Sequence, residues 1–108
     1  MYKLICIAKT PKNKEKFQVN LYNTETGKVK SIRFGLNGFG DYTIFNSTEG
    51  AKIADEHKER YIKRHQKRED WTESGVLTRG FWSKHLLWNK RTLEESINDI
   101  IKRFDLTF

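Results

Sequence analysis

The chain has 108 residues, of which 21 are Lys or Arg and 14 are Asp or Glu, and its formal net charge is +7 at pH 7. This length suits one hydrophobic core and leaves no room for a second, so we predict a single domain over residues 1–108. The single cysteine excludes an internal disulfide, and no apolar run approaches the roughly 20 residues of a membrane span. The basic balance favours acidic partners, which are nucleic acid, an anionic membrane surface or an acidic protein surface.

The first 36 residues alternate between apolar and polar side chains with the period of two that is typical of β-strands. Residues 2–8 are apolar on both alternating faces, which predicts a strand covered on both sides, with Cys6 buried, and no signal peptide. Alternation returns over 17–22 and 29–36, so we predict a three-stranded antiparallel meander over residues 1–36. Lys12 and Lys14 in its first turn are more typical of a solvated strand edge than of a docking surface.

Residues 37–50 form a glycine-rich connection in this interpretation. Glycines at 35, 38 and 40 lack both the Lys-Ser/Thr pair of a phosphate-binding loop and the spacing of a dinucleotide-binding loop. The segment is therefore predicted to be a hinge that leads out of the sheet. Asn46, Ser47 and Thr48 near its end are expected to cap the helix that follows.

Residues 51–108 are predicted to be helical. Good helix formers run from Ala51 to about Gln66, and Thr92 with Glu95 forms a capping box that opens a last helix. With a short helix around residue 85, this makes about three helices packed on the sheet. The predicted fold class is α+β.

The stretch GFWSKHLLWNK, residues 80–90, is apolar most of the way around a helix. One face of a small domain is not expected to cover all of these side chains, so we predict that Phe81, Leu86 and Trp88 are core residues and that Trp82 or Leu87 reaches a partner. Lys84 is expected to meet water or an acidic neighbour. Trp71 lies in a turn-rich loop as a further aromatic anchor. The candidate partner contacts are Trp71, Trp82, Lys84 and Leu87.

Catalytic chemistry is not indicated. His57 and His65 lie eight residues apart on one predicted helix, about 12 Å by the helical rise, too far to share one metal ion. A nucleophilic Cys6 would need exposure that a strand core opposes. No catalytic residue, metal ligand or cofactor is therefore predicted, and the protein is not expected to be an enzyme.

Two binding roles remain open. Surplus tryptophan and arginine are typical of protein–protein interfaces. Basic residues beside aromatic ones also suit a groove for single-stranded nucleic acid, although no known nucleic-acid-binding motif occurs. The candidate basic surface consists of Lys12, Lys14, Arg60, Lys63, Arg64, Lys67 and Arg68.

Six short motifs share an unusual order: GDYT (40–43), ERYIKRH (59–65), REDWT (68–72), GFWSK (80–84), LLWNK (86–90) and TLEESI (92–97). They resemble a family of small uncharacterised proteins from nucleocytoplasmic large (giant) DNA viruses, over roughly residues 38–104. The sequence departs from the family in the lead into the helix, residues 44–54.

The resemblance carries no catalytic residues over to this chain. It implies a viral protein that is made in the host cytoplasm and located in the virion. The expected role is a minor capsid or capsid-associated protein whose partners are other viral structural proteins. The alternative is a small basic nucleic-acid-binding protein of the viral core or infected cell.

Overall fold

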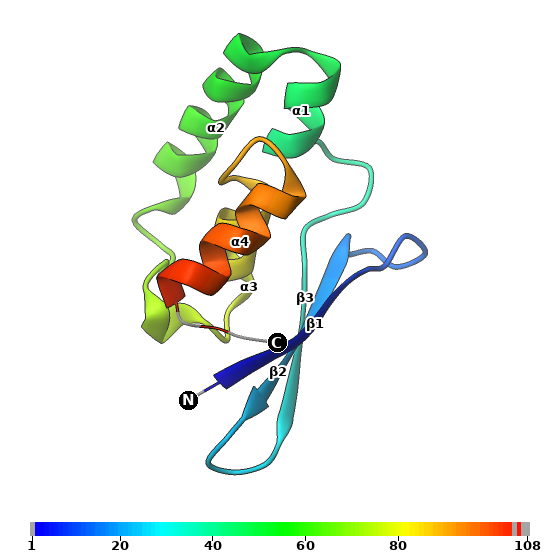
Figure 1. The fold of residues 1–108 in the computed structure, drawn as a ribbon. Coiled ribbons are helices and arrows are strands. Elements are labelled where there is room, and N and C mark those ends of the chain that lie inside the picture. The colour runs from blue at the N-terminus through cyan, green and yellow to red at the C-terminus, as the bar shows by residue number, and fades with distance from the viewer. Residues whose placement is uncertain (1, 105, 107–108) are drawn as a thin grey trace.

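The computed structural model describes residues 2–104 and 106, and it places a sheet before a set of helices (Figure 1). The predicted α+β class with an N-terminal three-stranded antiparallel meander is confirmed, with strand order β1-β2-β3. The strands are β1 (Tyr2–Lys9), β2 (Phe17–Asn23) and β3 (Val29–Phe34). The helices are α1 (Tyr42–Thr48), α2 (Ala51–His65), α3 (Arg79–Trp82) and α4 (Leu93–Phe104), with short segments η1 (Glu73–Gly75) and η2 (Ser83–Leu87).

A bulge in β1 changes which of its side chains face the core. Leu4 pairs with Leu21 and Cys6 pairs with Asn20, so Ile5 is the extra residue on this strand. Leu4 is buried, whereas Ile5 is exposed and Cys6 is half-buried. The prediction that both faces of this strand are covered, with Cys6 in the core, is therefore wrong: one face packs and the other is open.

The hydrophobic core lies between the inner face of the sheet and the helices that follow Gly75. Val19, Leu21 and Phe34 supply the sheet side of one continuous cluster, and Phe81 and Ile100 are among its helical members. The alternation of β2 places every second side chain in this cluster, as the period of two requires. The core therefore joins residues from both ends of the chain.

The glycine-rich connection is shorter than predicted because helix α1 begins at Tyr42. Asp41 caps this helix, its Oδ1 accepting a hydrogen bond from the Ile44 amide at 3.1 Å. Asn46, Ser47 and Thr48 consequently lie inside α1 and do not cap α2, which instead follows Gly50 at φ 90°. These residues form helices weakly, so the α1 segment carried little helical signal.

Helices α1 and α2 form a hairpin that lies at the end of the molecule away from the strand turn 24–28 (Figure 1). The buried residues of α2 are Ala54 and Tyr61. The Tyr61 ring stacks on Trp88 with centroids 4.7 Å apart, and Lys58 Nζ donates a hydrogen bond to the Asn89 carbonyl at 2.7 Å. The hairpin is thus attached to the rest of the chain by side chains at a few positions.

The last helix begins as predicted. The amide of Glu95 donates a hydrogen bond to Thr92 Oγ1 at 3.2 Å, and the Thr92 hydroxyl donates to the Glu95 carboxylate at 2.9 Å. This local exchange satisfies an amide that the first turn of a helix would leave without a partner. The side chain of Ser96 then accepts a hydrogen bond from the Lys90 amide at 3.0 Å, which closes the turn before α4.

Candidate functional site

Two of the four residues predicted to touch a partner are buried within the chain. Trp82 has 0% of its surface exposed and Leu87 has 2%. Trp82 packs against Phe34 of the sheet, and its Nε1 donates to the Val76 carbonyl at 2.7 Å. Leu87 packs so closely on Gly35 that a Cβ there would lie 2.8 Å from Leu87 Cδ1. The prediction that one of these side chains is exposed to reach a partner is wrong.

The reason lies in how the tryptophan-rich segment is wound and covered. Helix α3 ends at Trp82 and continues as η2, a π-helical segment that takes more residues per turn than the α-helix assumed from sequence. Its side chains therefore point in several directions, and different neighbours cover each direction. Phe81 contacts Phe104 of α4, Trp82 contacts the sheet, and Trp88 contacts Tyr61 of α2.

Trp71 and Lys84 are engaged with each other. Trp71 is half-buried, and its Nε1 donates a hydrogen bond to Glu69 Oε1 at 3.1 Å. Lys84 Nζ lies 5.5 Å from the centroid of the Trp71 indole, a cation–π contact. Burial, together with the charge of nearby Lys58, lowers the pKa of Lys84 to about 8. Lys84 thus meets an aromatic ring where an acidic neighbour or water was expected.

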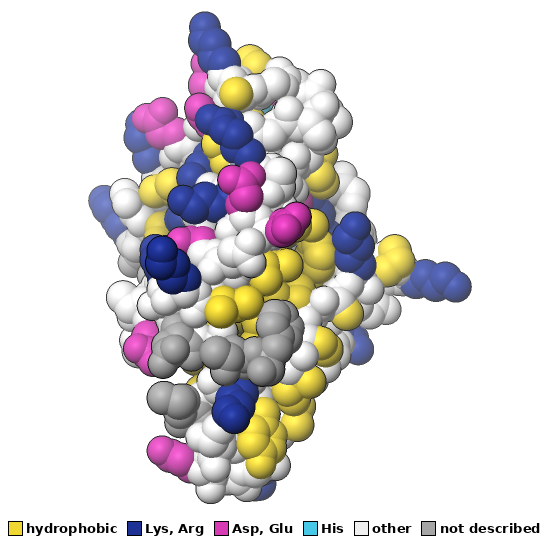
Figure 2. All heavy atoms as spheres, viewed as in Figure 1, with side chains coloured by type: hydrophobic (Ala, Val, Ile, Leu, Met, Phe, Trp, Pro, Cys, Tyr) yellow, Lys and Arg dark blue, Asp and Glu magenta, His cyan; other side chains and the backbone are white. Residues whose placement is uncertain are grey.

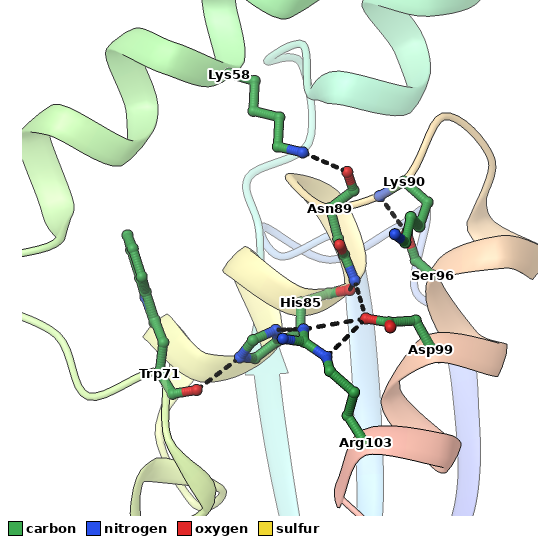
Figure 3. Close-up of polar contacts among 8 residues, drawn as sticks. All are labelled: Lys58, Trp71, His85, Asn89, Lys90, Ser96, Asp99 and Arg103. Carbon is green, nitrogen blue, oxygen red and sulfur yellow. Dashed lines mark hydrogen bonds and ion pairs between the residues drawn. The ribbon is translucent and has the colours of Figure 1, made fainter.

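A buried histidine organises the polar side of this segment (Figure 3). His85 Nδ1 lies 2.8 Å from Arg103 Nη2, and its Nε2 lies 2.8 Å from the Trp71 carbonyl. Because arginine only donates, Nδ1 accepts and Nε2 carries the proton that it donates to the carbonyl. Burial, reinforced by the charges of Lys84 and Arg103, lowers the pKa of His85 to about 4. His85 is therefore a neutral structural residue at neutral pH.

An acidic residue on α4 balances the arginine of this network. Asp99 Oδ2 accepts hydrogen bonds from Arg103 Nε at 3.0 Å and from Asn89 Nδ2 at 2.7 Å (Figure 3). These contacts hold the pKa of Asp99 below its usual range against the opposing effect of burial. His85 and Asp99 both bond Arg103, and Asn89 bonds Asp99, so the cluster joins η2 to α4.

The residues predicted to form a basic surface are all exposed, but they divide between two parts of the chain. Several are already engaged: Lys63 pairs with Glu59 at 3.3 Å, and Arg60 Nη2 donates to His57 Nδ1 at 3.1 Å. Lys12 and Lys14 lie in the turn after β1, and Arg60, Lys63, Arg64, Lys67 and Arg68 lie on α2 and the turn after it.

Lys14 and Arg64, from these two parts, line one cleft. Arg79 of α3 lines the same cleft, although sequence reasoning did not single it out. The signal for Arg79 was weak, since a single cation between Thr78 and Gly80 forms no charge pattern along the chain. Tertiary structure brings the three together.

The open face of the sheet carries exposed apolar side chains at one end. Ile5, Tyr22 and Val29 are 45%, 37% and 56% exposed, and Tyr22 pairs directly with Val29. Figure 2 shows hydrophobic side chains in a band that runs from beside α4 down over the strands. Tyr22 stands at an outer position of the alternating pattern, so sequence reasoning could have identified this surface and did not.

The other end of the open face is polar. Arg33 Nε donates to Gln18 Oε1 at 3.0 Å, and Ser31 Oγ donates to Asn20 Oδ1 at 2.6 Å. Asn20 Nδ2 in turn donates to Cys6 Sγ at 3.3 Å. These cross-strand bonds hold side chains that face solvent in register. The open face therefore has an apolar half and a polar half.

Among residues 2–104 and 106, no helix is both long and apolar enough to cross a membrane. Nor does this part of the chain bring three or more His, Cys, Asp or Glu side chains together as a metal site. Comparison of the chain with protein-family models, with curated proteins and with solved structures found no match in any of the three. The functional argument therefore rests on the surfaces of this chain.

Proposed function

We propose that this protein is a structural component of a virus particle, a minor capsid or capsid-associated protein that contacts other viral structural proteins. The viral source and the location in the virion rest on the family resemblance of the motifs in residues 38–104. The observation that best supports a protein-contact role is the apolar half of the open sheet face, Ile5, Tyr22 and Val29. Neighbouring apolar side chains on adjacent strands are more typical of a protein interface than of a surface that stays in contact with water.

The edge of the sheet at β1 supports the same role. Among residues 2–104 and 106, β1 pairs with β2 and with no other strand, so within this part of the chain its second edge is open to pairing. The opposite edge strand, β3, is protected by Lys28, Lys30 and Arg33, whereas β1 has no charge between Lys3 and Lys9. An extended segment of another protein could add to this edge, a common mode of recognition.

Mass spectrometry of purified particles tests the proposal directly, because detection in infected cells but not in particles would contradict it. A double variant, Tyr22→Ser with Val29→Thr, tests the surface. It should be incorporated several-fold less than wild type, since it makes the apolar half of the open face polar. The matched control is Ile53→Ser with Leu77→Ser, which alters two residues of 38% exposure outside the sheet. Equal incorporation of both double variants would contradict a contact through the sheet.

Nucleic-acid binding is the second candidate, supported by the exposed cations of α2 and the turn after it. Neutralising phosphates with such residues releases counterions, so affinity should fall steeply with salt. Titration with single-stranded and duplex DNA at two salt concentrations measures this slope. Absence of binding near physiological salt would leave the structural role as the remaining proposal.

A further inference from the structure

A cleft separates the sheet end of the molecule from helix α2. Its volume is about 660 Å³, and its walls come from the end of the β1–β2 turn, the glycine-rich connection, α2 and α3. Tyr61, Leu87 and Trp88 line its apolar part. Phe39, on the glycine-rich connection, also lines it and is 67% exposed. The exposed ring of Phe39 thus lies on the same cleft wall as an apolar surface.

Three of the cations that line this cleft have no side-chain partner among the described residues. Its acidic residues are Glu15, Asp41 and Glu69, of which Asp41 is paired with Lys16 at 2.7 Å. Glu69 accepts from Trp71 Nε1 and contacts His65 Nδ1 at 3.2 Å. The remaining cations form no side-chain hydrogen bond or ion pair with any residue that the structure describes: Lys14, Arg64 and Arg79.

The carboxyl group of Glu69 packs against Gly80, the residue that follows Arg79. Gly80 makes close approach possible, because a Cβ there would lie 2.7 Å from Glu69 Cδ. The oxygens of Glu69 contact Trp71 Nε1 and His65 Nδ1, which hold the carboxylate in place without cancelling its charge. The cleft lining has one more cation than carboxylates, so it favours anions: Lys14, Lys16, Arg64 and Arg79 against Glu15, Asp41 and Glu69.

A buried hydroxyl group also lacks a partner here. Tyr61 is 6% exposed, and its Oη has no hydrogen-bond partner among the described residues. Burial, with the charge of Glu69, raises the pKa of Tyr61, whereas the charge of Arg64 opposes the rise. The hydroxyl oxygen has almost no accessible surface, so Tyr61 presents its ring and not its hydroxyl to the cleft.

We propose that this cleft binds nucleotide units of single-stranded nucleic acid. Arg64 and Arg79 bind phosphate oxygens, Lys14 adds charge, and Phe39 stacks on a base. Guanidinium groups match phosphate geometry, and exposed aromatic rings beside cations are the usual means of holding unpaired bases. The site deepens the nucleic-acid candidate and does not depend on a role in the particle.

Fluorescence anisotropy of the full chain with a labelled oligothymidylate of about ten nucleotides tests the site. The double variant Arg64→Gln with Arg79→Gln should bind at least about tenfold more weakly, because each lost contact is charge-assisted. The slope of log affinity against log salt should decrease by about 1.4, or about 0.7 for each lost phosphate contact. The matched control, Lys28→Gln with Lys102→Gln, removes the same charge from exposed positions outside both the cleft and the cations of α2, and it should keep the slope of wild type.

Two single variants distinguish a built site from diffuse attraction. Tyr61→Phe removes a covered hydroxyl that has no partner among the described residues, so it should change neither the melting temperature nor binding. Phe39→Ala should weaken oligothymidylate binding while competition by inorganic phosphate is unchanged. Normal oligothymidylate binding by Phe39→Ala would overturn the site as described.

Other ligands and the particle assay complete the test. Equal affinity for duplex DNA or for polyglutamate of similar length would overturn recognition of unpaired nucleotides. So would equal weakening by the cleft and control double variants, and so would no binding by wild type at low salt. If thymidine monophosphate competed as strongly per site as the oligomer, the cleft would be assigned to free nucleotides. Incorporation of the Arg64→Gln/Arg79→Gln variant into particles is measured separately, so the failure of one proposal is not mistaken for failure of the other.

Discussion

Two regions of the molecule differ in how much of their surface is buried. One is the core between the sheet and η2, and the other is the α1–α2 hairpin. In the core, Phe34, Phe81 and Trp82 are almost completely buried and contact one another. In the hairpin, Tyr42 of α1 and Tyr61 of α2 are the buried rings, and the rest of α2 is largely charged and exposed. Because buried apolar area dominates stability, the core should carry most of the free energy of folding and the hairpin should open more easily.

Truncating one tryptophan in the core and one at the junction with the hairpin tests this difference most directly. Trp82→Ala should lower the free energy of unfolding by about 3–5 kcal/mol, because it leaves a large cavity and frees the Val76 carbonyl. Trp88→Ala removes a half-buried ring at the junction with α2 and should cost less. Urea unfolding measures both values.

Hydrogen exchange tells the two variants apart by location. Trp88→Ala should raise exchange in α2 while β2 stays protected, because the Tyr61–Trp88 stack attaches the hairpin. Trp82→Ala should raise exchange throughout the chain. Equal loss of stability in the two variants, with the same exchange pattern, would mean that the hairpin and the core unfold as one unit.

The second prediction concerns pH and the buried His85. Its pKa is about 4 in the folded chain and 6.5 without the fold, so above pH 6.5 the residue is neutral in both states. Between pH 6.5 and 4 only the unfolded chain binds the proton, so stability falls over this range and this contribution is constant below it. At 1.36 kcal/mol per pKa unit, the fall is about 3 kcal/mol.

His85→Gln should flatten that part of the stability profile, and His57→Gln, on the exposed hairpin, serves as the comparison. Guanidinium titrations at several pH values give the free energies. If wild type and His85→Gln lose stability in parallel from pH 6.5 to 4, then His85 binds its proton in the folded chain and the network of Figure 3 does not hold it neutral.

The smallest effect is expected on the exposed side of α2. Lys63→Ala breaks the ion pair with Glu59, in which both side chains are about two-thirds or more exposed. Such a pair contributes about 0.2–0.5 kcal/mol, so the melting temperature should hardly change. A loss comparable to that of Trp88→Ala would show that α2 charges stabilise the hairpin beyond solvent-screened pairing.

The strands and the last helix were predictable because their signals are local. Alternation of Val19 and Leu21 with polar residues defines one face of β2, and the Thr92–Glu95 capping box defines the start of α4. Helix α1 was not predictable in this way, because Asn46, Ser47 and Thr48 are weak helix formers and only the Asp41 cap and packing on α2 hold them.

The contact residues were the harder part of the prediction. Either Trp82 or Leu87 was expected to be exposed, because a straight α-helix cannot bury both together with Phe81. The π-helical turn and the neighbours on three sides remove that conflict. In the same way, Lys14, Arg64 and Arg79 are far apart in sequence, and no pattern along the chain connects them to one cleft.

By itself, the sequence determined the three strands, the helices α2 and α4 after them, the excess of positive charge and the need to bury a tryptophan-rich segment, because periodicity, capping and composition are properties of neighbouring residues. Only the tertiary structure decided which aromatic rings are covered, which cations keep no acidic partner and where Tyr61 is left without a hydrogen bond. Those outcomes depend on contacts between residues distant in the chain, and packing settles them jointly.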